Sequence, residues 1–191
     1  MTTSLAADAN IMTLRAYLNR VSRPADQPAF WSAGALAAAL AGLPPGEPQA
    51  IVLTANTRGS QGEIAPDLSL VLQEIRPGQQ SAPHRHSFWH LYIVQAGRGA
   101  ACIEGAGEAR AIAAGDIVFV PPFHSHGFDN REGAESLILI TLQNMPQLAQ
   151  LGCFMREGEA GSWYLVHTPG EPATTRFEGR LSPAATGPDA A

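Results

Sequence analysis

The sequence predicts an all-β domain, a sandwich or small barrel, preceded by N-terminal helices. Three observations support this fold class. From residue 50 onward, short apolar or alternating runs recur at intervals of roughly 8–12 residues, the spacing typical of sandwiches and barrels. Gly, Pro or Asn separates these runs, and no crossover helix is indicated between them. The first fifty residues instead carry apolar residues at helical spacing.

Residues 1–49 form the expected helical arm. Between Leu5 and Val21, apolar residues recur at three- and four-residue spacing, which is typical of an amphipathic helix. A second, alanine-rich helix is expected from Ser32 to Leu43, with Ser32 as its N-cap and two prolines and a glycine as its stop. These helices could pack on the barrel, mediate a dimer or cover the mouth of a pocket.

The barrel is expected over residues 50–145. Residues 146–168 are expected to pack on it as a C-terminal extension with one helical turn and a strand-like run at Trp163–His167, and residues 169–191, rich in Pro, Gly, Ala and Thr, to form a flexible tail. The strand-like runs of the barrel are Ala50–Thr54, Leu68–Ile75, Ala82–His86, Phe88–Gln95, Ala100–Glu104, Arg110–Ala113, Asp116–Val120, His124–Phe128 and Ser136–Leu142.

Composition excludes several function classes. With 191 residues, of which 45% are apolar and 15% charged, the chain has the length of about one domain and ample material for a core. All twelve basic residues are Arg, so Schiff-base chemistry and a P-loop lysine are ruled out. The formal net charge of −5 argues against a nucleic-acid partner or an anionic membrane surface.

Cysteine usage and the N-terminus favour a cytoplasmic protein. Cys102 and Cys153 are too few for a disulfide framework or a Cys-ligated zinc site. The N-terminus shows no basic region followed by an apolar one, as a secretion signal would. The longest apolar stretch, Ala33–Leu43, is too short to span a membrane.

Five of the six histidines lie between residues 84 and 126. In an extended chain, His84 and His86 point to one face, and so do His124 and His126. His90 begins the next strand-like run. Imidazoles on neighbouring strands of a barrel can converge on one divalent cation, and neutral imidazole suits Fe(II), Zn, Ni, Cu or Mn. The alternative is a set of half-buried, hydrogen-bonded side chains with no ligand role.

Two segments resemble the motifs of the cupin superfamily. Residues 78–97 are similar to its first motif, with His90 standing where a glutamate is usual, and residues 115–130 are similar to its second motif, with Phe123 in place of a glycine. The resemblance covers about residues 66–143 and implies a double-stranded β-helix, or jelly-roll, barrel with a metal bound inside. The matching positions are Gly78, His84, His86, Gly97, Gly115, Pro121, His126 and Asn130.

The resemblance implies His84, His86 and His126 as metal ligands. His90 occupies the fourth position, either as a fourth ligand or as a neighbour of a three-histidine site with open positions. Without the usual carboxylate the metal keeps its full charge, which favours an anionic, chelating substrate. A three-histidine set resembles that of gentisate-type ring-cleaving dioxygenases. One divalent ion per chain is therefore expected, with Fe(II) favoured and Zn, Ni or Mn as alternatives.

Tyr92 and His124 are the candidate catalytic residues beside the metal. Tyr92 has the parity of His90 and should project inward, either to donate a proton or simply to fill the barrel interior. His124 is expected to line the pocket rather than to ligate. Arg76 could reach a substrate carboxylate, whereas Arg85, between two inward histidines, should face solvent.

The predicted function is that of a metal-dependent cupin enzyme, a non-haem Fe(II) dioxygenase acting on a small, plausibly aromatic organic acid. Two alternatives stay open. One is a non-oxidative lyase, isomerase or decarboxylase in which the metal acts as Lewis acid and Tyr92 as base. The other is a small-molecule-binding module without turnover. The expected partners are a small-molecule substrate and a second copy of the chain in a homodimer.

Overall fold

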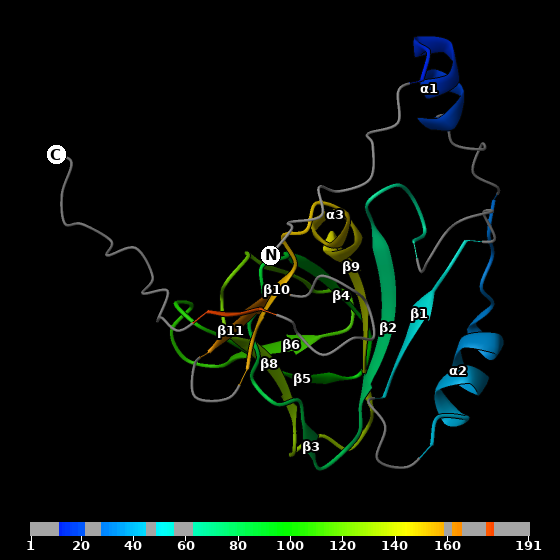
Figure 1. Ribbon diagram of the computed structural model, residues 1–191. Helices are drawn as coiled ribbons and strands as arrows, with labels where there is room; N and C mark the ends of the chain where they lie inside the picture. Colours follow the sequence, from blue (N-terminus) through cyan, green and yellow to red (C-terminus); the bar gives the residue numbers. More distant parts are fainter. Residues whose placement is uncertain are drawn as a thin grey trace, which may run out of the picture.

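The computed structural model of this chain describes residues 12–21, 28–44, 49–55, 63–158, 162–165 and 175–177. Two antiparallel sheets face each other and form the predicted jelly-roll (Figure 1). The first sheet has the order β1 (Ala50–Leu53), β2 (Ser69–Ile75), β9 (Leu137–Gln143), β4 (His90–Ala96) and β7 (Ile117–Val120). The second has the order β3 (Gln79–Gln80), β8 (His126–Asn130), β5 (Arg98–Ile103) and β6 (Arg110–Ala113).

The core lies between the two sheets and is apolar at one end only. Along β9 the buried positions alternate, and they change from Leu137 and Leu139 to Thr141 and Gln143 toward the end of the strand. The apolar core therefore fills the end where β9 begins, and polar groups gather where it finishes. The core residues are Ile75, Tyr92, Val94, Ala101, Ile112, Val120, Phe128, Leu137 and Leu139.

Two motif glycines are explained by their backbone. Gly97 joins β4 to β5 with φ +76°, and a Cβ atom there would collide with the carbonyl oxygen of Ser136. Gly115, in the turn before β7, has φ +96°. Because side chains disfavour this left-handed region, glycine is the residue both turns require.

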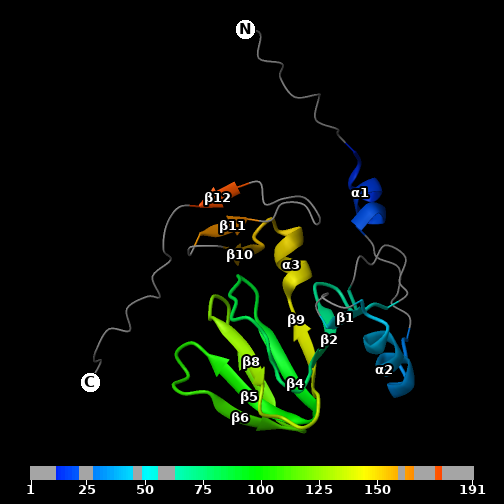
Figure 2. The same ribbon diagram turned by 90° about the horizontal axis from the view of Figure 1, so that it is seen from below.

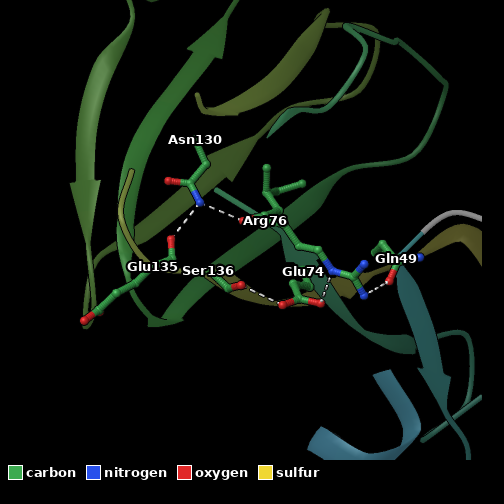
Figure 3. Close-up of polar contacts among 7 residues, drawn as sticks. Gln49, Glu74, Arg76, Asn130, Glu135 and Ser136 are labelled. Carbon is green, nitrogen blue, oxygen red and sulfur yellow. Dashed lines mark hydrogen bonds and ion pairs between the residues drawn. The ribbon is translucent and has the colours of Figure 1, made fainter. Parts of the chain in front are cut away.

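Hydrogen bonds close the apolar end of the barrel (Figure 3). The motif residue Asn130 donates from Nδ2 to the carbonyl oxygens of Ile75 and Glu135, each at 2.8 Å. Arg76 donates to Glu74 at 3.2 Å and to Gln49 at 2.6 Å. Arg76 thus lies directly after the last residue of β2, and its guanidinium is already hydrogen-bonded to Glu74 and Gln49.

Most predicted strands are present, with one exception. The run Ala82–His86 is not a strand: it makes only two isolated bridges, His84 with His126 and His86 with Arg156. The short strands β3 and β10 (Met155–Glu157) were not predicted from the sequence. Strand β10 begins a third sheet with β11 (Trp163–Leu165) and β12 (Thr175–Phe177).

Strand β12 corrects the expectation of a flexible tail over residues 169–191, because Thr175–Phe177 pairs with β11. Because this three-residue strand depends on pairing with β11 and not on its own sequence pattern, it is not predicted from the sequence. The other residues of that segment lie outside the described residues, as do the end of the run Trp163–His167 and residues 5–11 of the predicted first helix.

The helices are short. Ser32 caps α2 (Ala33–Ala41) as predicted, since its Oγ accepts a hydrogen bond from the Ala35 amide. Helix α2 lies beside β1, whereas α1 (Leu14–Val21) stands apart from the barrel (Figure 1 and Figure 2). Helix α3 (Met145–Gln150) follows β9. None of the described helices is long and apolar enough to cross a bilayer.

Candidate metal centre

Four histidines meet at the polar end of the barrel. His90 is the first residue of β4 and His126 the first of β8, while His84 and His86 lie on the segment between β3 and β4. One nitrogen of each imidazole lies within 4.8 Å of the corresponding nitrogens of the other three. His84 is exposed at the rim and the other three are buried. The arrangement brings together the four residues that the sequence predicts as ligands.

Three of these imidazoles are oriented by backbone carbonyls. The Nδ1 atoms of His84, His86 and His126 each lie 2.9–3.1 Å from a carbonyl oxygen. A carbonyl only accepts, so each Nδ1 carries the hydrogen and each Nε2 keeps its lone pair. Such contacts commonly orient metal-ligating histidines. The acceptors belong to Ala82, Phe88 and His124, respectively.

His90 is held differently. Its Nε2 lies 2.8 Å from Nε2 of His86, and its buried Nδ1 has no hydrogen-bond partner among the described residues. Because Nε2 of His86 keeps its lone pair, Nε2–H of His90 donates to it. The His90 ring also stacks on Tyr92, with centroids 4.9 Å apart. No carbonyl therefore presets this imidazole as a ligand, in contrast to the other three.

Burial keeps the three inner imidazoles neutral. Burial, followed by the neighbouring imidazoles, lowers the pKa of His86 to about 3 and that of His90 to about 2. Burial also lowers the pKa of His126 to about 4. All three rings therefore offer lone pairs at neutral pH, and the buried Nε2 of His126 has no partner. A neutral, all-nitrogen donor set with an unsatisfied member fits one divalent cation such as Fe(II), Zn(II) or Ni(II).

The C-terminal extension anchors the loop that carries two of the histidines. Ser87 donates its amide to the Met155 carbonyl at 2.9 Å, and its Oγ accepts from the Met155 amide at 2.8 Å. The same hydroxyl donates to the Cys153 carbonyl at 2.9 Å. Strand β10 thus holds the ligand loop from outside the barrel.

Arg85 points away from the histidines but is not solvated as predicted. Its guanidinium makes ion pairs with Glu104 at 3.2 Å and with Glu157 at 3.0 Å, and the side chain is only 21% exposed. Packing of β10 over the loop covers an arginine that local alternation alone places in solvent. These ion pairs join the loop to both the barrel and the extension.

Tyr92 lies inside the barrel, as its parity predicts, between His90 and Phe128. Burial raises the pKa of its hydroxyl above the usual value of 10. A phenol that resists ionisation is a poor general base but can still donate a hydrogen bond.

His124 does not join the cluster, although alternation places it on the same face as His126. Its ring is exposed and lies outside the group of four, and its Nδ1 contacts the Pro122 carbonyl at 3.0 Å. It directly follows Phe123, whose φ of +65° interrupts the extended chain at the turn before β8. A glycine is usual there in the cupin motif, so Phe123 keeps the backbone of the residue it replaces.

Sequence reasoning missed a row of polar residues on the inner face. Gln143 pairs with His90 on one side and with Ser69 on the other, and Thr141 pairs with Tyr92. All three newly identified side chains are buried. The available signal was parity, since Thr141 and Gln143 occupy the same inward positions as the leucines of β9. Arg76, at the opposite end of β2 from Ser69, does not belong to the site.

Comparisons with known proteins agree with this architecture. Residues 71–142 match a family model described as a cupin domain. No curated protein matches the sequence. Among solved structures, salicylate 1,2-dioxygenase from Pseudaminobacter salicylatoxidans matches at 19% identity with a TM-score of 0.64, over 80% of this chain and 51% of that one.

Two further structures, of a point mutant of salicylate 1,2-dioxygenase from Pseudoaminobacter salicylatoxidans, match at 21% identity. The first has a TM-score of 0.68 and covers 78% of this chain and 45% of that one. The second, in complex with gentisate, has a TM-score of 0.67 and covers 79% and 44%. The present chain thus matches about half the length of these dioxygenases, and the likeness is one of fold. Together with the two motifs and the jelly-roll, these matches show that residues 71–142 form a cupin domain.

Proposed function

We propose that this cupin binds one divalent ion, Fe(II), through His84, His86 and His126, with His90 as the fourth nitrogen donor. We further propose that it is a non-haem dioxygenase acting on a small aromatic organic acid. The observation that carries this proposal is the convergence of four imidazole nitrogens, three of them buried, at the polar end of the barrel. The likeness of fold to salicylate 1,2-dioxygenase supports the choice of reaction.

The charge of the site favours an acidic substrate. The group of four contains imidazoles only, so no carboxylate of the cluster offsets the charge of a divalent ion. Arg76, which precedes the ligand segment, and Arg85, which lies between His84 and His86, are both engaged with carboxylates. The metal, when bound, supplies positive charge for an anionic substrate and sites for dioxygen.

Aromatic rings keep the donor nitrogens oriented. Phe88 stacks on His86 with centroids 3.5 Å apart and planes 5° from parallel, and Tyr92 stacks on His90. These rings exclude water from the imidazole faces, which maintains the lowered pKa values. Tyr92 keeps its proton because burial raises its pKa, so within this mechanism it acts as a hydrogen-bond donor.

Oxygen uptake by iron-loaded protein tests the proposal. Protein purified without oxygen and loaded with Fe(II) should hold one iron per chain and consume oxygen with salicylate or gentisate. His126→Gln should abolish both, whereas His124→Gln, which changes the exposed histidine two residues before it, should keep both. Stoichiometric iron without oxygen uptake on any hydroxybenzoate would contradict the dioxygenase function.

We also propose that the protein is a homodimer. Helix α1 leaves its apolar side chains exposed, Leu14 at 72%, and the outer face of β4 and β7 exposes others, Ile117 at 66%. The side chains are Leu14, Tyr17 and Leu18 on α1 and Ile93, Ile117 and Phe119 on β4 and β7. Exposed apolar side chains on a sheet face favour association with a second copy of the chain.

Sedimentation tests the dimer. The wild type should sediment as a dimer, and Ile117→Lys combined with Phe119→Lys should give a folded monomer. Gln80→Lys, which adds the same charge at an exposed polar position of β3 in the other sheet, should leave the dimer intact. A wild type that sediments as a monomer at micromolar concentration would refute the proposal.

A further inference from the structure

Unpartnered buried polar atoms are concentrated beside the histidines. Within the part of the chain that the structure describes, six buried side-chain nitrogen or oxygen atoms lack a hydrogen bond, and four of them lie on the inner face around the cluster. Native proteins satisfy about 90% or more of such atoms, so a local excess requires an explanation. The four are Ser69 Oγ, Thr141 Oγ1, His90 Nδ1 and His126 Nε2.

A metal ion explains the unpartnered Nε2 of His126 but not the other three atoms. The lone pair of that Nε2 is satisfied by a cation amid the imidazoles, whereas Nδ1 of His90 is not the ring nitrogen that contacts His86, and the hydroxyls of Ser69 and Thr141 lie on neighbouring strands outside the group of four. Both hydroxyls are almost completely buried, with Ser69 at 1% and Thr141 at 2% exposure. A buried, unpaired hydroxyl lowers stability. Their position therefore points to a second ligand group beside the metal.

Sheet register places these hydroxyls next to the cluster. Ser69, Gln143 and His90 form one row across β2, β9 and β4, and Thr141 lies in the next row, opposite Tyr92. Side chains directly opposite each other in antiparallel strands have Cβ atoms about 4.5–5.5 Å apart. The row is thus a continuous polar strip that begins at His90 and extends across the inner face.

The chemistry of the strip selects its ligand. Ser69 and Thr141 contribute hydroxyls and Gln143 contributes an amide, so every group in it is neutral and can both donate and accept. Such a strip does not balance a carboxylate, but it pairs well with an uncharged hydroxyl or carbonyl. The β4 residues in these two rows are His90 and Tyr92, which are also uncharged at neutral pH.

We propose that Ser69, Thr141 and Gln143 form a subsite that binds an uncharged hydroxyl or carbonyl group of the substrate. The substrate's carboxylate then lies on the metal, and this half of the assignment rests on the proposed function. The subsite makes the enzyme selective for hydroxylated or oxo acids over the parent acid. A lost hydrogen bond between neutral groups corresponds to about tenfold in affinity.

Calorimetric binding to Zn(II)-loaded protein tests the subsite without turnover. Benzoate and its 2-, 3- and 4-hydroxy derivatives are the probes. At least one hydroxybenzoate should bind about tenfold more tightly than benzoate. Ser69→Ala or Thr141→Val should abolish that preference and leave benzoate binding unchanged. Thr54→Val, the same change at an exposed threonine, should preserve it.

Chelation of the metal by the 2-hydroxyl group would produce a preference that survives in both variants. Such a surviving preference, the absence of any preference, or the absence of binding by all four acids would overturn the subsite.

Stability of the protein without metal or ligand gives a second, independent readout. Because the Thr141 hydroxyl is unpaired, Thr141→Val should raise Tm by about 2–4 °C in a chain of this length, whereas Thr54→Val should not change it. A lower Tm for Thr141→Val would mean that the hydroxyl is structural, which contradicts the subsite. Failure of oxygen uptake alone would refute the dioxygenase reaction and leave both of these readouts standing.

Discussion

Removal of the metal should make this fold sensitive to mild acid. In the folded chain, burial holds the pKa values of His86, His90 and His126 at about 3, 2 and 4. In the unfolded chain the same groups titrate near 6.5. Between these limits the unfolded state binds protons that the folded state excludes, so stability is complete above about pH 6.5 and falls as the pH falls.

The size of the effect follows from the same values. Each histidine costs about 1.4 kcal/mol per pH unit below 6.5, or about 2 kcal/mol at pH 5. Three independent groups would lower the free energy of unfolding by about 6 kcal/mol. The titrations are coupled, because protonation of one histidine exposes the others to water, so a loss of about 3–6 kcal/mol is expected. Because a domain is stable by only about 5–15 kcal/mol, the metal-free protein should be close to unfolding at pH 5.

Urea unfolding followed by tryptophan fluorescence measures this loss. The metal-free wild type is compared at pH 7, 6 and 5 with His90→Leu, which removes one buried titrating group, and with His124→Gln, which removes an exposed one. His90→Leu should reduce the loss by about 2 kcal/mol, and His124→Gln should follow the wild type. Equal free energies of unfolding at pH 7 and pH 5 in the wild type would refute the reasoning.

Three further outcomes are expected. His86→Gln should weaken Zn(II) binding at least tenfold more than His90→Gln in a chelator competition, because a backbone carbonyl orients the imidazole of His86 and none orients that of His90. Equal losses of affinity would contradict this. Ser87→Ala should lower the free energy of unfolding by about 1–3 kcal/mol in urea, since it leaves the Met155 amide unpaired, whereas no loss would mean that β10 does not anchor the loop. Tyr92→Phe should keep iron stoichiometry and reduce oxygen uptake without shifting its pH profile, and a shifted profile would indicate that the phenol titrates.

The sequence predicts the histidine cluster because the decisive information is local. Alternation and turn glycines place His84, His86, His90 and His126 at the start of strands or beside them, and the register of the barrel then brings them together. The predicted strand at Ala82–His86 is absent, yet its histidines still reach the cluster, since isolated bridges to neighbouring segments orient them.

The remaining features depend on contacts that local patterns do not encode. His124 is expected to line the pocket, but its ring is exposed, directly after a turn in which Phe123 adopts a left-handed φ. The strip of Ser69, Thr141 and Gln143 exists only after β2 and β4 pair with the same strand, β9. Nothing in the local sequence indicates that a serine at the start of one strand and a glutamine at the end of another become neighbours.

The two ends of the barrel therefore make opposite contributions to stability. On β4 the inward positions run from Val94 to His90, and on β9 they run from Leu137 to Gln143, so both strands become polar in the same direction. Unpaired hydroxyls and crowded imidazoles destabilise the metal-free fold, and the packed leucines at the other end offset them. Substitutions to apolar residues at the polar end should thus stabilise the chain and impair binding, whereas truncations at the apolar end should only destabilise it.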